Sequence, residues 1–308
     1  MAGPDPAVAD VRRAVRTFLP PGEVVVAAVS GGADSLALLA GLAWEAPRHG
    51  RVARAVTVDH GLHAGSAAQA AAVVAVAGSL GVACDVLAVR PLGGNEADAR
   101  RARYAALDAY SPDAPILLGH TRDDQAEQVL LGLARGSGAR SLAGMPRVRG
   151  RYVRPLLDLP RATTERACAA LGLTPWHDPA NDDPRFARSR VRHAVLPLLE
   201  AELGPGVAAA LARTADLLRA DADLLDALAA DVDSLAVPAL AALPEAVRTR
   251  VLRRAAIAAG AVANDLTAAH VAGMDGLVTN WHGQDGVDLP GGLAAVRDCD
   301  TVTFRPPR

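Results

Sequence analysis

The clearest chemical signal in the chain is a short loop rich in glycine and serine that also carries an aspartate. Its residues are Ser30, Gly31, Gly32, Ala33, Asp34 and Ser35. An apolar run at 23–29 predicts a buried strand before the loop, and the run 36–40 predicts the start of a helix after it. Backbone N–H groups at a helix start have no intrahelical partner and lie at the positive end of the helix dipole. We therefore predict that the loop binds the phosphates of a nucleotide.

The aspartate in this loop makes a metal ion part of the prediction. Asp34 would repel a bare phosphate, and a Mg²⁺ ion between carboxylate and phosphate oxygens would remove that repulsion. The alternative is an ordinary strand-to-helix turn in which a serine caps the helix. The chain contains no lysine, and its 32 residues of the Lys and Arg class are all arginine. A Walker-type P-loop, which requires a lysine, is thereby excluded.

Other polar residues follow other predicted strands. His120, Asp123 and Asp124 stand at a strand end and a helix start. Here the acids either cap the helix or, together with the histidine, bind a metal and orient a reacting group, and both interpretations stay open. Asp59 closes another strand. Glu96 opens a helix whose charged residues form either a solvated face with salt bridges or a substrate contact.

The element pattern predicts an α/β fold with a doubly wound, mainly parallel sheet. After a leading helix in residues 1–21, strands are expected at 23–29, 53–58, 83–89 and 114–118, each followed by a helix. Such repeated units favour parallel strands, and ligands bind at the carboxyl ends of those strands. The glycine-rich loop, Asp59 and His120 all fall at such ends. The nucleotide domain is expected to span 22–204, and residues 205–308 are expected to form a helical subdomain with a short β tail.

The net charge of −2 hides an uneven distribution of arginine. Between Arg135 and Arg192 there are 12 Arg and 5 Asp or Glu, whereas from Leu199 to the end there are 9 Arg and 15 acids. The middle region is therefore a candidate surface for a polyanion. No apolar run approaches the ~20 residues of a membrane span and no signal peptide is evident, so we expect a cytoplasmic protein with no membrane partner. Three distant cysteines predict neither a disulfide framework nor a zinc site.

Several motifs in a fixed order resemble those of one enzyme superfamily. The loop at 30–35 is similar to the PP-loop of the N-type ATP pyrophosphatases, which adenylate a carbonyl oxygen and then let a nucleophile displace AMP. Within that superfamily the motifs resemble those of the tRNA(Ile)-lysidine synthetase family. The matching segments are Val58–Leu62, Asn95–Arg100, Arg103–Tyr104, Gly119–Thr121, Asp123–Gln125, Arg135–Gly138, Arg154–Leu157 and Trp176–Asn181, followed by Arg188 and Arg192. The resemblance covers about residues 22–200.

The resemblance implies a PP-loop ATPase fold, like that of the adenine nucleotide alpha hydrolases, and a specific ligation. ATP with Mg²⁺ would adenylate the ring carbonyl oxygen of the wobble cytidine in an isoleucine tRNA with a CAU anticodon. The ε-amine of free lysine would then displace AMP and leave lysidine. The catalytic candidates are Asp34, Asp59, Glu96, His120 and Asp124; the metal candidates are Asp34, Asp123 and Asp124; the tRNA-binding candidates are Arg135, Arg154, Arg188 and Arg192. No obligate protein partner is expected, and a homodimer is left open.

The chain departs from the family pattern in places, and other PP-loop functions compete. His63 stands where the family often has arginine, and Gln128 stands where threonine is common. Long members of the family add separate carboxyl-terminal domains that help to hold tRNA, whereas this chain is shorter. Its tRNA binding is therefore expected to rest mainly on the Arg135–Arg192 region. A tRNA thiolation enzyme would need sulfur-carrying cysteines, whereas Cys84 and Cys168 fit buried positions. An amidotransferase would need an attached or partner glutaminase, and NAD synthetase would have no use for the arginine-rich region. A protein that only binds RNA would not need the metal-binding candidates Asp34, Asp123 and Asp124 or the nearby His120.

Overall fold

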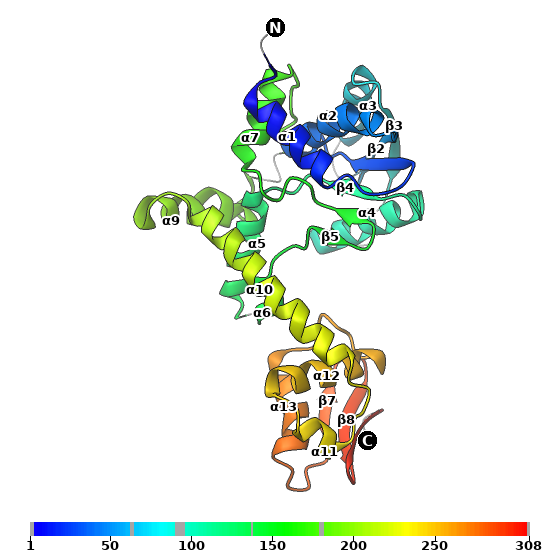
Figure 1. Ribbon diagram of the computed structural model, residues 1–308, viewed down its shortest axis with the longest axis vertical. Helices are drawn as coiled ribbons and strands as arrows, with labels where there is room; N and C mark the ends of the chain where they lie inside the picture. Colours follow the sequence, from blue (N-terminus) through cyan, green and yellow to red (C-terminus); the bar gives the residue numbers. More distant parts are fainter. Residues whose placement is uncertain (1–2, 62–64, 90–95, 137, 179–181, 307–308) are drawn as a thin grey trace. The chain divides into compact units, whose positions relative to one another are not determined.

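The computed structural model describes residues 3–61, 65–89, 96–136, 138–178 and 182–306, with the side chains of Glu96 and Ala97 left out (Figure 1). The chain divides into two compact units. The first comprises residues 1–136 and 144–215, and the second comprises residues 137–143 and 216–308. The division falls inside helix α10 (Val207–Ala230), beyond the boundary that the sequence places after residue 204. The domain ranges given above remain predictions.

A six-stranded sheet with the order β3-β2-β1-β4-β6-β5 forms the centre of the first unit. All neighbouring strands are parallel except β5 and β6. The strands are β1 (Val24–Ala28), β2 (Val52–Asp59), β3 (Ala83–Ala88), β4 (Ile116–Leu118), β5 (Val148–Arg149) and β6 (Tyr152–Val153). The chain runs outward from β1 to β3 and then returns to place β4 on the other side of β1. The predicted doubly wound, mainly parallel sheet is confirmed, and its strand order reverses between β1 and β4, where such sheets bind ligands.

Helices cover both faces of this sheet. Helices α1 (Pro6–Thr17), α2 (Ala33–Arg48), α3 (Ser66–Ser79) and α7 (Arg161–Ala170) contribute to one core cluster, whose fully buried residues include Leu38, Leu39 and Leu42. Helix α4 (Glu96–Tyr110) contributes Leu107 to a second cluster with Val26 and Ile116. Because β1 is flanked by paired strands and lies under helices, its run of Val and Ala is apolar on both faces.

The remaining helices of the first unit carry the charged residues that matter below. Helix α5 (Arg122–Ala134) follows β4. A continuous helical stretch is formed by α8 (Ala187–Arg190), the π-helical turn η2 (Val191–Val195) and α9 (Leu196–Leu203). Val191 and Leu196 of this stretch join Ala126 of α5 in a small buried cluster. This apolar contact holds the arginine-bearing turns of α8 and η2 against the first turns of α5.

The second unit combines helices with a small antiparallel sheet. Its short helix α6 (Ala139–Leu142) comes from the segment 137–143. The other elements are the end of α10, helices α11 (Val237–Ala241), α12 (Glu245–Ala258) and α13 (Ala268–Thr279), and strands β7 (Val287–Leu289), β8 (Leu293–Asp298) and β9 (Thr301–Arg305). The core of this unit includes Leu240, Leu252, Met274 and Leu277. The expected helices are present in this part of the chain, and its β tail consists of three strands.

Among the described residues, no single helix is long and apolar enough to cross a bilayer. One bent pair of helices, Ala187–Leu203 with Val207–Ala230, meets the criterion by length and composition alone.

Candidate active site

The glycine-rich loop connects β1 to α2 at the point where the strand order reverses. Gly32 is the N-cap of α2 and provides no side-chain cap, so the serine-capped turn considered as the alternative does not form. Ser35 instead folds its hydroxyl back into the loop. Its Oγ accepts hydrogen bonds from the N–H groups of Ser30 and Gly31, both at 3.1 Å, and donates to the carbonyl of Gly32 at 2.8 Å. The first turn of α2 therefore keeps uncapped N–H groups, as an anion site requires.

Two glycines are needed for this loop to form. Gly31 has φ +90°, and a Cβ at this position would lie 2.2 Å from Nε2 of Gln69. Gly119, directly after β4, allows the next strand end to approach the loop. A Cβ on Gly119 would lie 3.0 Å from the backbone carbonyl atoms of Asp34 and the N atom of Ser35. The loop is thus held by close backbone contact at the switch point of the sheet.

Asp34 lies in the first turn of α2 and is held by residues of α7. Its Oδ1 accepts a hydrogen bond from the hydroxyl of Thr164, and its Oδ2 lies 3.4 Å from Nε of Arg161. Burial, and then the negative charge of Asp124, raise the pKa of Asp34 to about 6, despite the opposing effects of Thr164 and Arg161. The side chain is 22% exposed, so a ligand at the loop can reach it. Asp34 is therefore poised to gain or lose a proton when a charged ligand binds.

Asp124 has both carboxylate oxygens engaged. Its Oδ2 caps α5 by accepting hydrogen bonds from the N–H group of Thr121 at 2.8 Å and from its hydroxyl at 2.9 Å. Its Oδ1 lies 3.0 Å from Nη2 of Arg161, 3.1 Å from Nη2 of Arg188 and 3.3 Å from Nη2 of Arg192. Burial alone would raise the pKa of Asp124, but the arginines outweigh it and lower the pKa to about 2. The capping function considered for this aspartate is therefore present, and its part in metal binding and in orienting a reacting group stays a prediction.

Glu127, one helical turn after Asp124, completes the charge network. Its side chain is fully buried. Its carboxylate accepts hydrogen bonds from Nε of Arg188 and from Nε of Arg192, both at 2.7 Å, and lies 3.4 Å from Nη1 of Arg161. We name the six residues Asp34, Asp124, Glu127, Arg161, Arg188 and Arg192 the arginine–carboxylate network. It joins α2, α5, α7, α8 and η2 beside the loop.

Three residues of this site, Glu127, Arg161 and Thr164, were not among the candidates from the sequence. A usable signal existed for Glu127 but not for Arg161, which lies 37 positions from Asp124. Asp124 and Glu127 are spaced i, i+3, and Arg188 and Arg192 are spaced i, i+4, so each pair lies on one face of its helix. For Thr164 there was no such signal, because its contact with Asp34 depends on how α7 packs against α2.

The arginine network changes the interpretation of the expected tRNA-binding residues. Arg188 and Arg192 face Asp124 and Glu127 instead of open solvent. Arg154 is only 4% exposed, and its Nη1 donates to the carbonyl of Pro146 at 2.8 Å. The structure therefore does not place these three side chains on an open basic surface. Arg135, at the C-cap of α5, is exposed.

The expected metal ligands do not form one cluster. Oδ2 of Asp123 accepts a hydrogen bond from the backbone N–H of Arg161 at 2.8 Å, and Asp124 is occupied as described. Within the described part of the chain, no three His, Cys, Asp or Glu side chains are grouped so that they could hold a metal ion. Asp34 alone keeps an accessible carboxylate next to the phosphate-binding N–H groups. The predicted set of three is thus reduced to one residue.

Of the other predicted catalytic residues, His120 and Asp59 lie at the ends of β4 and β2 and have separate contacts. His120 follows β4, and burial lowers its pKa to about 4, so its imidazole is neutral at pH 7. Its Nδ1 has no hydrogen-bond partner among the residues described. Asp59 ends β2 and accepts a hydrogen bond from the N–H group of Gly61 at 2.9 Å, which lowers its pKa. Glu96 begins α4, and its side chain lies outside the described part of the structure.

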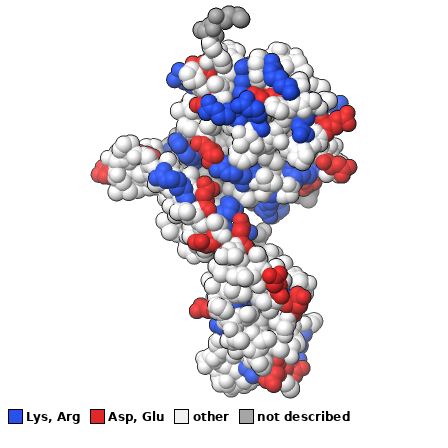
Figure 2. All heavy atoms as spheres, in the orientation of Figure 1, with Lys and Arg blue, Asp and Glu red and all other residues white. Residues whose placement is uncertain are grey.

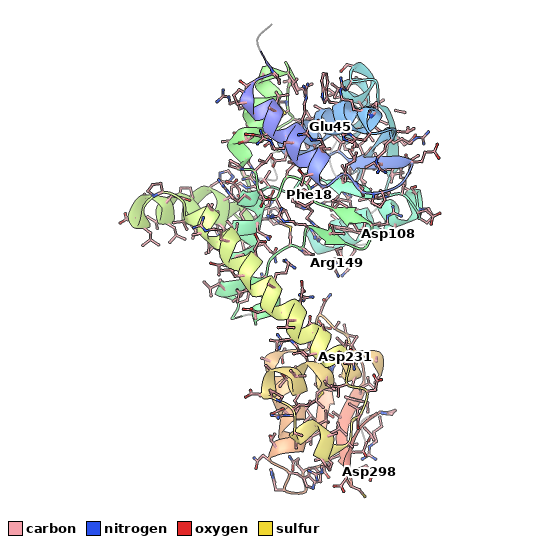
Figure 3. All side chains as sticks on the ribbon, viewed as in Figure 1. Phe18, Glu45, Asp108, Arg149, Asp231 and Asp298 are labelled. Carbon is pink, nitrogen blue, oxygen red and sulfur yellow. The ribbon has the colours of Figure 1, made fainter. Side chains whose placement is uncertain are left out.

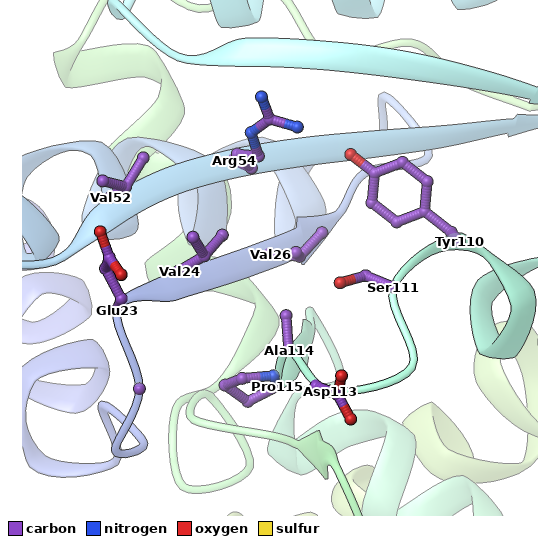
Figure 4. A pocket seen from close by; sticks show the side chains of 11 residues that line it. Glu23, Val24, Val26, Val52, Arg54, Tyr110, Ser111, Asp113, Ala114 and Pro115 are labelled. Atoms are coloured by element: carbon purple, nitrogen blue, oxygen red, sulfur yellow. The ribbon is translucent and has the colours of Figure 1, made fainter.

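A second hollow lies at the opposite edge of the sheet (Figure 4). Its volume is about 570 Å³, and its lining includes Glu23, Arg54, Tyr110, Ser111 and Asp113. It borders the amino-terminal ends of β1 and β2, away from the carboxyl ends where parallel sheets of this kind bind ligands. The loop edge is accordingly the candidate active site.

Comparisons with known proteins agree with this placement. A family model described as a PP-loop domain matches residues 8–199, and one described as the TilS substrate binding domain matches residues 235–302. A tRNA(Ile)-lysidine synthase from Thermobifida fusca is 54% identical, with 94% of this chain and 95% of the relative covered. The chain belongs to the tRNA(Ile)-lysidine synthase family. A second member, from Streptomyces coelicolor, is 47% identical over 98% of this chain and 99% of the relative.

Membership of the tRNA(Ile)-lysidine synthase family makes the chain a carbon–nitrogen ligase that uses ATP and modifies tRNA. Among solved structures, the U34-tRNA thiolase NcsA from Methanococcus maripaludis is similar, with a TM-score of 0.58 and 20% identity. The match covers 69% of this chain and 80% of the thiolase. At this identity it shows the shared PP-loop fold alone.

Proposed function

We propose that the chain joins lysine to the wobble cytidine of an isoleucine tRNA with a CAU anticodon. In the first step the cytosine ring carbonyl oxygen attacks the α-phosphorus of ATP, an O–P bond forms and pyrophosphate leaves. In the second step the lysine ε-amine forms a C–N bond to the activated carbon, the C–O bond breaks, AMP leaves and the amine gives up its protons. The uncapped start of α2 beside the arginine–carboxylate network is the observation that carries this proposal.

The loop and the arginine–carboxylate network would have different roles in binding ATP. The N–H groups at the start of α2 would hold ATP phosphates, helped by the hydroxyl of Ser30. Arg161, Arg188 and Arg192 lie at the same edge, but the carboxylates of the network balance their charges. These arginines would hold the carboxylates in place beside the loop. The charge that builds up on the phosphates during adenylation would be met by the N–H groups and by Mg²⁺ at Asp34.

Asp34 fits the role of a magnesium ligand. Mg²⁺ is commonly bound by one or two carboxylates together with substrate phosphates and water, and Asp34 presents one carboxylate next to the phosphate-binding loop. The ion would supply charge neutralisation between Asp34 and the phosphates of ATP. Asp123 and Asp124 keep their structural contacts in this proposal. His120, neutral at pH 7, Asp59 at the end of β2 and Glu96 at the start of α4 would orient the cytosine and the lysine ammonium groups.

The second unit is proposed to contribute to holding the tRNA. Residues 235–302 match the TilS substrate binding domain and form a separate core of helices and antiparallel strands. Their surface is rich in acids, so contact with RNA would depend on particular arginines and on shape more than on overall charge.

The test is incorporation of labelled lysine into transcripts of isoleucine and methionine tRNAs that both carry a CAU anticodon. AMP and pyrophosphate are followed in the same reactions. The proposal expects lysine in the isoleucine transcript only, with one AMP and one pyrophosphate for each lysine. AMP formation with no lysine on either RNA would leave the PP-loop chemistry in place and overturn the assignment of substrate.

A further inference from the structure

The arginine-rich middle region turns out to be largely neutralised within the protein. Seven of its 12 arginines lie within 4.0 Å of a carboxylate. They are Arg140, Arg147, Arg161, Arg166, Arg185, Arg188 and Arg192. Arg154 is buried. Arg161, Arg188 and Arg192 are held in the arginine–carboxylate network, whereas the pairs of Arg140, Arg166 and Arg185 are exposed. The charge excess between Arg135 and Arg192 therefore overstates the positive charge that is free to meet RNA, and a basic surface outside this region would add to it.

A basic surface lies on the face made by α1 and α2, next to the buried carboxylate of Glu45. Cζ of Arg12 lies 3.7 Å and Cζ of Arg48 lies 3.4 Å from the centre of the Trp44 ring. Two guanidinium groups cannot both stack over one face of an indole at these distances, so they lie on opposite faces. Neither arginine has an ion-pair partner within the described residues. We name Arg12, Arg16, Trp44 and Arg48 the α1–α2 patch.

The acids near this patch do not cancel its charge. Glu45 is buried, and its Oε1 lies 4.0 Å from Nη1 of Arg16, the limit of an ion pair (Figure 3). Asp10 is engaged by Arg13 at 3.1 Å. Figure 2 shows basic side chains gathered over α1 and α2 with few acidic ones among them. The patch thus carries three arginines against a single buried carboxylate.

The two arginines that flank Trp44 repel each other. Burial and the positive charge of Arg48 lower the pKa of Arg12. Cation–π attraction to the shared indole holds both groups in place, and Trp44 is still 40% exposed between them. A negatively charged ligand at this surface would relieve the repulsion. Because both groups are guanidiniums, which bind phosphate oxygens in pairs, phosphate is the best matched anion.

The patch lies within reach of a polynucleotide bound at the loop. Helix α2 begins at Ala33 beside the loop, and Trp44 lies eleven residues along the same helix. At a rise of 1.5 Å per residue this is about 17 Å. A nucleic acid duplex carries a phosphate about every 3.4 Å along each strand, so this length corresponds to roughly five phosphates. A tRNA whose anticodon occupies the site would have its stem backbone at this range.

We propose that the α1–α2 patch binds the phosphate backbone of the tRNA substrate outside the reacting nucleotide. The proposal rests on the proposed function in taking tRNA as the substrate. It assigns Arg12 and Arg48 to phosphate contacts that position the RNA and carry no sequence information.

The test uses the full chain and an unmodified isoleucine tRNA transcript. The dissociation constant is measured at several salt concentrations for the wild type, Arg48→Gln and the double variant Arg12→Gln with Arg48→Gln. Arg13→Gln is the matched control, because Arg13 lies on α1 but is already paired with Asp10. ATP binding is measured in parallel to show that the first unit is folded. Each lost phosphate contact should lower the slope of log K against log salt by about 1.

The double variant should bind tRNA at least tenfold more weakly than the wild type, and its slope of log K against log salt should be lower by about 2. Arg48→Gln should have an affinity and a slope between those of the wild type and the double variant. The control should bind within about twofold of the wild type. Unchanged tRNA affinity in the double variant, with ATP binding intact, would overturn the proposal. Binding to vesicles that contain phosphatidylserine is measured for the same proteins. If the double variant lost vesicle binding and kept its tRNA affinity, the patch would be a site for lipid phosphates and the proposal would be overturned. A wild type that binds tRNA through the patch but forms no lysidine would instead refute the proposed reaction and leave the patch standing.

Discussion

Replacing Asp34 with asparagine should cost activity and yet stabilise the fold at neutral pH. The side chain keeps its shape and an oxygen for Thr164, but it no longer ionises. In the wild type the pKa of Asp34 is about 6, against 3.8 for an ordinary aspartate, chiefly because of burial and the negative charge of Asp124. The folded state therefore holds this proton more tightly than the unfolded state does. As pH rises from 3.8 to 6, ionisation favours the unfolded chain, and stability falls.

The size of this effect follows from the two pKa values. A difference of about two units at ~1.4 kcal/mol each gives about 3 kcal/mol over the whole titration. Roughly 2 kcal/mol of this change in the free energy of unfolding takes place between about pH 4.5 and 7.5, the range in which the wild type and the variant can both be measured. Asp34 is 22% exposed, so solvent screening makes this an upper value. Asp34→Asn lacks the titration and should keep a more constant stability.

The assay is urea unfolding of the wild type and Asp34→Asn at several pH values, followed together with lysine incorporation. The difference in free energy of unfolding should move in favour of the variant by up to about 2 kcal/mol as the pH rises, while turnover falls at least ~100-fold. Taking the difference removes the titration of other groups common to both proteins. A difference that stays constant with pH would show that Asp34 titrates normally and would refute the reasoning. Retained turnover would refute its role with the metal.

Three further predictions follow from the site. Binding of Mg²⁺ with ATP should ionise Asp34 and release close to half a proton near pH 6, measured by calorimetry in buffers of different ionisation enthalpy; equal heats in all buffers would contradict the magnesium role. Glu127→Gln should lower the free energy of unfolding by about 3–5 kcal/mol, because three guanidiniums lose a fully buried charged partner. Asp10→Asn, at an exposed ion pair, should lower it by less than about 1 kcal/mol, and similar urea midpoints for the two variants would count against the network. Gly119→Ala should weaken ATP binding at least ~10-fold, because the added Cβ would displace the backbone of Asp34. Gly78→Ala in α3, whose added Cβ would have no atom within 4 Å, should bind ATP normally, and equal affinities of the two variants would show that the loop tolerates the shift.

The architecture of the first unit was largely readable from the sequence. The apolar runs that became β1, β2, β3 and β4 differ from their expected bounds by at most two residues at either end. Strands β1 and β4 are largely buried and continuously apolar, whereas the edge strand β3 is largely exposed and carries Asp85. Beyond β4 the pattern weakens. Strands β5 and β6 have two residues each, too few for an alternating pattern.

The second unit was harder to predict. Helix α13 carries two glycines, and its buried Met274, Leu277 and Val278 are spaced i, i+3, i+4, as on one helical face. These residues belong to the core of the second unit. The expected β tail has three strands, a number that the sequence alone did not specify.

The candidate site shows a sharper limit. The loop was visible because all of its residues are adjacent, and their types match the backbone conformation that an anion site needs. The arginine–carboxylate network was not visible, because Arg161 and Arg188 lie 37 and 64 positions from Asp124. In a sequence, a charge that will be buried in an ion pair looks the same as a solvated one. Because of that ambiguity, the count of arginines in a region does not give the number that are free on its surface.

The distance along the chain between Asp34 and its partners bears on how the protein is made. Arg161 and Thr164 follow Asp34 by 127 and 130 residues, and the N–H of Trp176 donates to the carbonyl of Gly31 from farther still. At a synthesis rate of roughly 5–20 residues per second, the loop leaves the ribosome on the order of ten seconds before the residues that hold it. A nascent chain therefore cannot complete its nucleotide site until translation has passed Trp176. ATP binding then reports that α7 has docked, and nucleotide added during refolding should speed only the steps that come after that event.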